Sequence, residues 1–246
     1  MPHLVIFLDL DDTILQTVSK CPPDQTLTPA AFNRAGEVLS FMTPAQQRLV
    51  AFWSEQATVI PVTGRTDSAL ERVAIPFHSW RITHHGAVIR QPNALLPIWW
   101  HAQVRPLLNA ARQSLEKCAT WLNANAMAGG YRVSMHSLDD CLTYVSVKAD
   151  EDSTALTRLQ AQLVETGLPP ELTLHCNGNN LALMVKGAQK YDAVRRVIAE
   201  LKRDEPLATI GVGDSLTDLP FMQLCDFALV PKSSQIQIET WSRYAQ

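Results

Sequence analysis

The sequence of 246 residues lacks several features that would assign it to a specialised class of protein. No stretch approaches about 18 consecutive apolar residues, which is the length that a membrane-spanning helix needs. The net charge is only −3 and no run of Lys or Arg marks a surface for nucleic acid. We therefore expect neither a membrane nor a nucleic acid as a partner.

The N-terminus also lacks the basic segment and the small-residue cleavage site of a secretion signal. It begins instead with a short apolar run that leads to Asp9. The five cysteines are widely spaced and form no C-x-x-C pair, so neither a zinc site nor a disulfide framework is indicated. These absences predict a soluble, cytoplasmic protein with reduced thiols.

The chain does contain two clusters of acidic residues, one near each end. They are Asp9-Leu10-Asp11-Asp12-Thr13 and Gly213-Asp214-Ser215-Leu216-Thr217-Asp218. Each cluster follows an apolar run, 4–8 or 208–212, of the kind that forms a buried strand. Because ligands of open parallel sheets collect beyond the carboxyl ends of the strands, we expect both clusters to contribute to one site.

The spacing of these carboxylates predicts a metal ion. Alternate side chains of a strand point to the same side, so Asp9 and Asp11 can face one site, while Asp214 and Asp218 are one helical turn apart. Four carboxylates brought together would repel one another strongly without a cation. Mg2+ prefers carboxylate oxygens and can bridge to a phosphate of the substrate, so we expect Mg2+ as the cofactor.

The pattern of apolar residues predicts elements typical of an α/β protein. Thr43, Pro44 and Gln46 form a capping signature for a helix that ends near Gln56. A strand is expected over 58–62 and a short helix over 67–73, whereas 16–30 is interpreted as a loop or flap. After a helix that starts near Ala188, the strand over 208–212 restores the alternation of a parallel sheet.

The middle of the chain follows a different pattern. A strand over 86–89 and a long helix over 101–124 are expected, followed by two strands, a helix and two strands over 131–185. Polar and apolar residues alternate in Thr143–Lys148, which fits a sheet with one covered face. We therefore predict a Rossmann-like parallel-sheet core formed by 1–85 and 186–246, with an inserted α+β domain over 86–185.

Four segments, in order, resemble the motifs of the haloacid dehalogenase (HAD) superfamily. Asp9–Thr13 resembles the first motif, Val62-Thr63-Gly64-Arg65 the second, Lys190 the third and Gly213–Asp218 the fourth. The insertion lies where one branch carries its α/β cap, a branch that includes sucrose-phosphate and mannosyl-phosphoglycerate phosphatases. The resemblance implies the HAD fold and a Mg2+-dependent phosphatase for a small phosphorylated metabolite, with a sugar phosphate as the expected substrate.

The resemblance also implies the roles of individual residues. Asp9 would attack phosphorus and become an aspartyl phosphate, while Asp11 would protonate the leaving group and then deprotonate the attacking water. The phosphate-binding residues would be Thr63, Gly64 and Lys190. The metal ligands would be Asp9, the backbone carbonyl of Asp11, and Asp214, with Asp218 either contacting the metal or orienting its ligands.

Several alternatives remain open at this point. Lys186 competes with Lys190 for the third motif, although Lys190 leads directly into a helix. Arg65 could reach the substrate or anchor the edge of the sheet. His85 replaces the Asn that related proteins carry and would bear on substrate choice. A phosphosugar mutase and a non-catalytic phosphate sensor are the alternative functions, and the protein could be a monomer or a homodimer.

Overall fold

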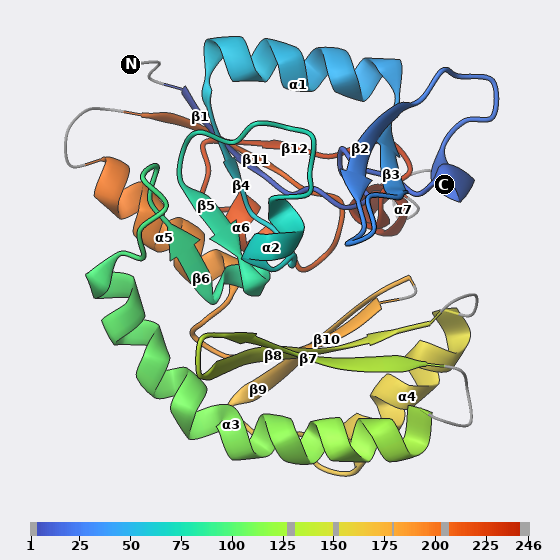
Figure 1. Ribbon diagram of the computed structural model, residues 1–246, viewed down its shortest axis with the longest axis vertical. Helices are drawn as coiled ribbons and strands as arrows, with labels where there is room; N and C mark the ends of the chain where they lie inside the picture. The colour runs from blue at the N-terminus through green and yellow to red at the C-terminus, as the bar shows by residue number, and fades with distance from the viewer. Residues whose placement is uncertain (1–3, 127–130, 150–152, 179, 203–206, 242–246) are drawn as a thin grey trace. The chain divides into compact units, whose positions relative to one another are not determined.

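The computed structural model describes residues 4–126, 131–149, 153–178, 180–202 and 207–241 (Figure 1). The chain forms two compact units, one built from residues up to Leu96 and from Lys190 onward, the other from Pro97–Gln189. The antiparallel pair β5 (Arg81–Thr83) and β6 (Val88–Arg90) groups with the first unit. The sequence prediction had instead begun the inserted domain at Gly86, within the turn that joins these two strands.

A parallel sheet of four strands forms the centre of the first unit. Its order is β12 (Phe227–Leu229), β11 (Ala208–Val212), β1 (Leu4–Leu8) and β4 (Thr58–Pro61). Leu8 pairs with Val212, so β1 and β11 end in register although they come from opposite ends of the sequence. This arrangement confirms the predicted α/β fold and the meeting of the two ends of the chain.

Helices cover both faces of this sheet. α1 (Pro44–Gln56) lies on one side, and α5 (Lys190–Leu201) lies on the other (Figure 1). Ile6 and Leu8 of β1 share a buried cluster with Val50 and Trp53 of α1. The four residues Val5–Leu8 are all buried, as expected for a parallel strand between two layers of helices. The remaining helices of the unit are α2 (Asp67–Leu70), α6 (Leu219–Met222) and α7 (Gln235–Trp241).

The segment interpreted as a loop or flap is more ordered than predicted. It contains the 3₁₀ turn η1 (Val18–Lys20) and the start of β2 (Thr28–Phe32), which pairs with β3 (Val38–Met42) in an antiparallel hairpin. Pro29 lies inside β2, and a proline normally argues against a strand unless the strand is at an edge. The prediction was wrong here because the two-stranded sheet is irregular, with shifts of register on both sides of Ala31.

The second unit is an antiparallel sheet with two helices. The strand order is β7 (Arg132–Leu138), β8 (Cys141–Lys148), β10 (Asn180–Val185) and β9 (Leu172–Asn177). The helices are α3 (Ile98–Ala126) and α4 (Ser153–Glu165). Val145 and Val147, on one face of β8, are fully buried, while on the other face Tyr144 is also buried and only Lys148 is exposed, so the predicted alternation holds in part. Among the helices that the structure describes, none combines the length and the apolar character that crossing a membrane requires.

The capping box of α1 gives a first testable prediction. The Thr43 hydroxyl accepts a hydrogen bond from the Gln46 amide, and the Gln46 side chain accepts one from the Thr43 amide. Thr43→Ala removes this cap and is expected to lower the free energy of unfolding by about 1 kcal/mol in urea titrations. Ser54→Ala, in the same helix, is the control and should cost little because alanine favours helix. Equal losses in both variants would contradict the assignment.

Candidate active site

The carboxyl ends of β1 and β11 position Asp9 and Asp214. The Asp9 amide donates to the Val212 carbonyl at 2.9 Å, which extends the pairing of β1 and β11 by one residue beyond Leu8. Asp214 follows β11 by two residues. Asp9, Asp214 and Asp218 each offer an oxygen, and these three oxygens lie within 4.8 Å of one another. All three residues are buried. The predicted meeting of the two acidic clusters therefore holds for these three side chains.

A tight turn after β11 orients Asp218. One carboxylate oxygen accepts hydrogen bonds from the Ser215 amide at 3.1 Å and from the Ser215 hydroxyl at 2.7 Å. A Cβ atom on Gly213 would lie 2.5 Å from the Asp218 Cβ. Only glycine fits at that position, which explains the Gly-Asp-Ser start of this segment.

Lys190 connects the two acidic clusters. Its Nζ donates to Asp9 Oδ1 at 2.6 Å and to Asp218 Oδ1 at 2.7 Å. Its side chain is only 12% exposed. Lys186, the alternative for the third motif, donates instead to the Pro170 carbonyl within the second unit. The structure thus brings Lys190 together with the carboxylates.

Thr13 contacts two of the carboxylates, a role that the sequence analysis did not assign. Its hydroxyl lies 3.0 Å from Asp9 Oδ2 and 3.3 Å from Asp214 Oδ1, and it is buried. The hydroxyl has one proton, so it donates to one carboxylate at a time. The available signal was its place in the Asp-x-Asp-x-Thr segment, four residues after Asp9.

The segment after β4 reaches the same edge of the sheet. The Val62 amide donates to the Leu8 carbonyl at 2.8 Å, so Thr63 follows the strand adjacent to Asp9. Thr63 is buried, and its carbonyl accepts from the His85 amide at 3.1 Å. The His85 ring lies against Gly64, where an added Cβ would lie 2.4 Å from Cε1. Thr63, Gly64 and His85 therefore form one packed group.

The carboxylate of Asp11 is not part of the buried cluster. Asp11 is exposed and accepts two hydrogen bonds from Arg65, from Nε at 2.8 Å and from Nη2 at 2.7 Å. The prediction that Asp9 and Asp11 face one site assumed a continuing strand, but β1 ends at Leu8. The Leu10 carbonyl then accepts from the amides of Thr13, Ile14 and Leu15, so the chain turns at Leu10 and Asp11 does not continue the strand.

The buried charges perturb one another. Burial raises the pKa of Asp9 well above its usual range, Lys190 opposes this shift, and the neighbouring Asp218 and Asp214 add to it. Burial by itself would lower the pKa of Lys190, but Asp218 and Asp9 outweigh it and raise that pKa. Burial likewise opposes the ionisation of Asp218, yet Lys190 and Ser215 outweigh it and lower the pKa of Asp218. Negative charge remains in excess around Asp9.

This donor set fits a hard divalent cation. The three carboxylates offer only oxygen, and when all of them are ionised their three negative charges exceed the single positive charge of Lys190. Mg2+ binds such oxygens and keeps several waters, which suits a site with few protein ligands. Asp9 and Asp214 would hold the ion, and Asp218, held by Lys190 and Ser215, would contact or orient it.

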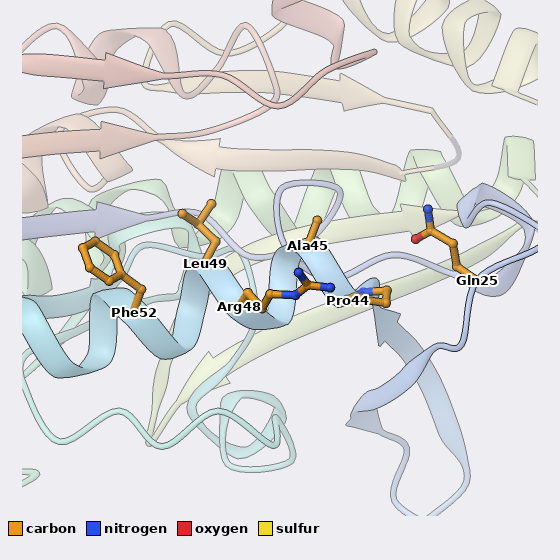
Figure 2. Close-up of a pocket in the computed structure, with 6 residues that line it drawn as sticks. All are labelled: Gln25, Pro44, Ala45, Arg48, Leu49 and Phe52. Atoms are coloured by element: carbon orange, nitrogen blue, oxygen red, sulfur yellow. The ribbon is translucent and has the colours of Figure 1, made fainter.

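A separate hollow of about 640 Å3 lies along α1 in the same unit. It is lined by Gln25, Pro44, Ala45, Arg48, Leu49 and Phe52 (Figure 2). None of these residues belongs to the carboxylate cluster, so the hollow is distinct from the candidate site.

Solved structures with the same architecture include several phosphatases. The sucrose-phosphatase from Synechocystis, in complex with sucrose and phosphate, has a TM-score of 0.58 and 17% identity, covering 99% of this chain and 88% of that chain. The C-terminal domain of trehalose-6-phosphate phosphatase from C. albicans has a TM-score of 0.62 and 13% identity, covering 100% and 78%. A haloacid dehalogenase-like hydrolase from B. subtilis has a TM-score of 0.57 and 16% identity, covering 98% and 92%.

The chain has the HAD fold. The resemblance drawn from the four motifs is therefore confirmed at the level of the fold, including the inserted second unit. No protein-family model matches the sequence, and neither does any curated protein. At identities of 13–17%, these structures establish the fold alone. The chemistry of the site depends on the residues of this chain.

The cluster predicts where Mg2+ binds. Asp214→Asn removes one charged ligand and is expected to weaken Mg2+ binding about 10-fold or more, as measured by isothermal titration calorimetry. Asp24→Asn, at an exposed position outside the cluster, should bind Mg2+ like the wild type. An unchanged affinity in Asp214→Asn would exclude Asp214 as a ligand.

The raised pKa of Asp9 predicts a gain of stability when its charge is removed. Ionisation of Asp9 at neutral pH favours the unfolded chain, because the folded state raises its pKa. Asp9→Asn should therefore unfold a few degrees higher than the wild type at pH 7 in chelator. The difference should disappear as the pH falls below about 4, where the unfolded carboxyl is protonated too. Thermal scans test this, and a lower midpoint at pH 7 would contradict it.

Proposed function

We propose that this protein is a Mg2+-dependent phosphatase that hydrolyses a small phosphorylated metabolite, with a sugar phosphate as the expected class, through an aspartyl phosphate at Asp9. The observation that carries the proposal is the buried cluster of Asp9, Asp214 and Asp218, bridged by Lys190 at the carboxyl edge of the parallel sheet. Such an edge is where open α/β sheets bind ligands.

Asp9 has the properties that a nucleophile needs. Its Oδ1 is held by Lys190 and its Oδ2 by Thr13, so both oxygens are oriented by hydrogen bonds. In the first step, a carboxylate oxygen forms a bond to phosphorus as the bond to the leaving oxygen breaks. In the second step, water attacks phosphorus and releases Asp9 with inorganic phosphate. The covalent intermediate divides one difficult displacement into two easier ones.

The surrounding residues would stabilise the charge on the phosphoryl oxygens. Lys190 supplies a positive charge, and the Thr63 hydroxyl and the Gly64 amide would donate to phosphoryl oxygens, whereas the Thr63 amide already donates to the Ile82 carbonyl at 2.9 Å. Bound Mg2+ would neutralise the excess negative charge of the carboxylates and of the incoming phosphate. Asp11 would give a proton to the leaving oxygen and take one from the attacking water.

The names of two neighbours in fold support a sugar phosphate as the substrate class. These two are named for phosphorylated sugars, trehalose 6-phosphate and sucrose phosphate. The inserted unit of this chain aligns along with the core in both, since the match covers nearly the whole chain. Arg65 and His85 are the candidate substrate-reading residues of the core.

Substitution of the proposed nucleophile gives the direct test. Purified protein is incubated with Mg2+ and a panel of hexose, disaccharide and glycerate phosphates, and release of inorganic phosphate is measured. Asp9→Asn is expected to show no turnover, whereas Asp11→Asn should retain a rate about 10²–10⁴-fold below the wild type. Asp24→Asn serves as the matched surface control. Near-full activity of Asp9→Asn, or of the wild type after exhaustive chelation, would contradict the proposal.

Product analysis separates the alternative functions. Free phosphate indicates a hydrolase, whereas an isomeric sugar phosphate without free phosphate would indicate a mutase. Binding of phosphate without turnover of any phosphate ester would indicate a sensor. We expect stoichiometric free phosphate.

A further inference from the structure

Gly64 and the ring of His85 occupy complementary space. The φ angle of Gly64 lies outside the left-handed region, whereas that of Gly86 is 110°, so its φ angle does not require glycine at position 64. The obstacle to a side chain there is the His85 ring. An added Cβ would lie 2.6 Å from Nε2 and 2.9 Å from Nδ1, whereas non-bonded heavy atoms in contact lie about 3.5–4.0 Å apart. The ring therefore takes the space that a side chain on residue 64 would fill.

The turn that carries His85 holds its ring against Gly64. His84 and His85 have positive φ angles of 52° and 57°. Such conformations cost energy in residues with a Cβ atom and persist only where the surrounding structure holds them. Here the His84 amide donates to the Arg65 carbonyl at 2.8 Å, and the His85 amide donates to the Thr63 carbonyl at 3.1 Å. The turn is thus bonded to the residues on both sides of Gly64.

The backbone of Gly64 has the properties of a donor to a bound anion. Gly64 is partly exposed, and among the residues that the structure describes, none accepts a hydrogen bond from its amide. Glycine has more conformational freedom than any other residue, so its amide keeps a defined direction only where neighbouring groups restrain it. The ring of His85 provides such a restraint on the side where a Cβ would otherwise lie.

We propose that His85 is a positioning residue whose ring, in place of a side chain on Gly64, holds the Gly64 amide in the direction from which it donates to a phosphoryl oxygen. This role rests on the proposed function, in which Gly64 binds the phosphoryl group. His85 acts through Gly64 and takes no part in any bond that forms or breaks.

Binding of inorganic phosphate to the Mg2+-loaded protein measures this role. His85→Ala removes the ring and should raise the dissociation constant of phosphate about 3-fold or more in isothermal titration calorimetry, because an ordered hydrogen bond is lost. The affinity for Mg2+ measured without phosphate should not change, because Gly64 is not a proposed metal ligand. His78→Ala, at an exposed histidine of the same unit, is the matched control and should change neither constant.

A methyl group at position 64 separates this role from a direct contact between His85 and phosphate. In the wild type, Gly64→Ala places a methyl group against the ring and should weaken phosphate binding. In a His85→Ala background, the same substitution should strengthen phosphate binding, because alanine restrains the backbone that the ring no longer holds. A methyl group cannot replace a hydrogen bond or a charge of the imidazole. No recovery in the double variant, or no loss in His85→Ala, would overturn the proposal.

A second variant covers a His85→Ala protein that does not fold. His85→Gly also removes the ring, and glycine adopts a φ of 57° at little cost, so the same loss and the same recovery by Gly64→Ala are expected. Equal losses of phosphate and Mg2+ affinity would show general damage to the site and would overturn the positioning role. A wild type that neither binds phosphate nor hydrolyses any ester would refute the proposed function itself, whereas an active wild type whose variants show no recovery refutes only the role of His85.

Discussion

The ammonium group of Lys190 holds carboxylates from both ends of the chain in one buried place. It contacts Asp9, which follows the first strand, and Asp218, which begins a helix more than two hundred residues later in the sequence. Three carboxylates with oxygens within 4.8 Å would not remain together in a buried setting without compensating charge. One lysine compensates only in part. The remaining negative charge makes this edge of the sheet a place for a divalent cation and, through it, for a phosphate.

The same edge also contains unusual backbone conformations. Asp12, His84 and His85 have positive φ values of 61°, 52° and 57°, which are uncommon for residues other than glycine. Strained residues of this kind tend to occur at functional sites, where the surrounding structure holds them. Here the amides of His84 and His85 donate to the carbonyls of Arg65 and Thr63, so the strained turn fixes the segment after β4. The strained turn and the buried charges thus lie at the same edge of the parallel sheet.

Much of the fold could be predicted from the sequence because its signals are local. Largely apolar runs marked β1 and β11, and the capping residues marked the first turn of α1. The hairpin of β2 and β3 was missed because Pro29 is a poor local signal for a strand and the pairing is irregular. The ion pair of Asp11 with Arg65 was not predicted for a related reason: the strand rule holds only while the strand continues, and the chain turns at Leu10. Contacts such as that of Thr13 with Asp214 depend on tertiary packing and have no local signature.

The proposed function depends on a single divalent cation bound by Asp9 and Asp214. Crystals of the protein grown with Mn2+ in place of Mg2+ would test this most directly, because Mn2+ gives an anomalous signal at its own position. We predict one strong anomalous peak within coordination distance of carboxylate oxygens from both Asp9 and Asp214. A fully occupied Mn2+ bound elsewhere, with no peak between these two residues, would contradict the account.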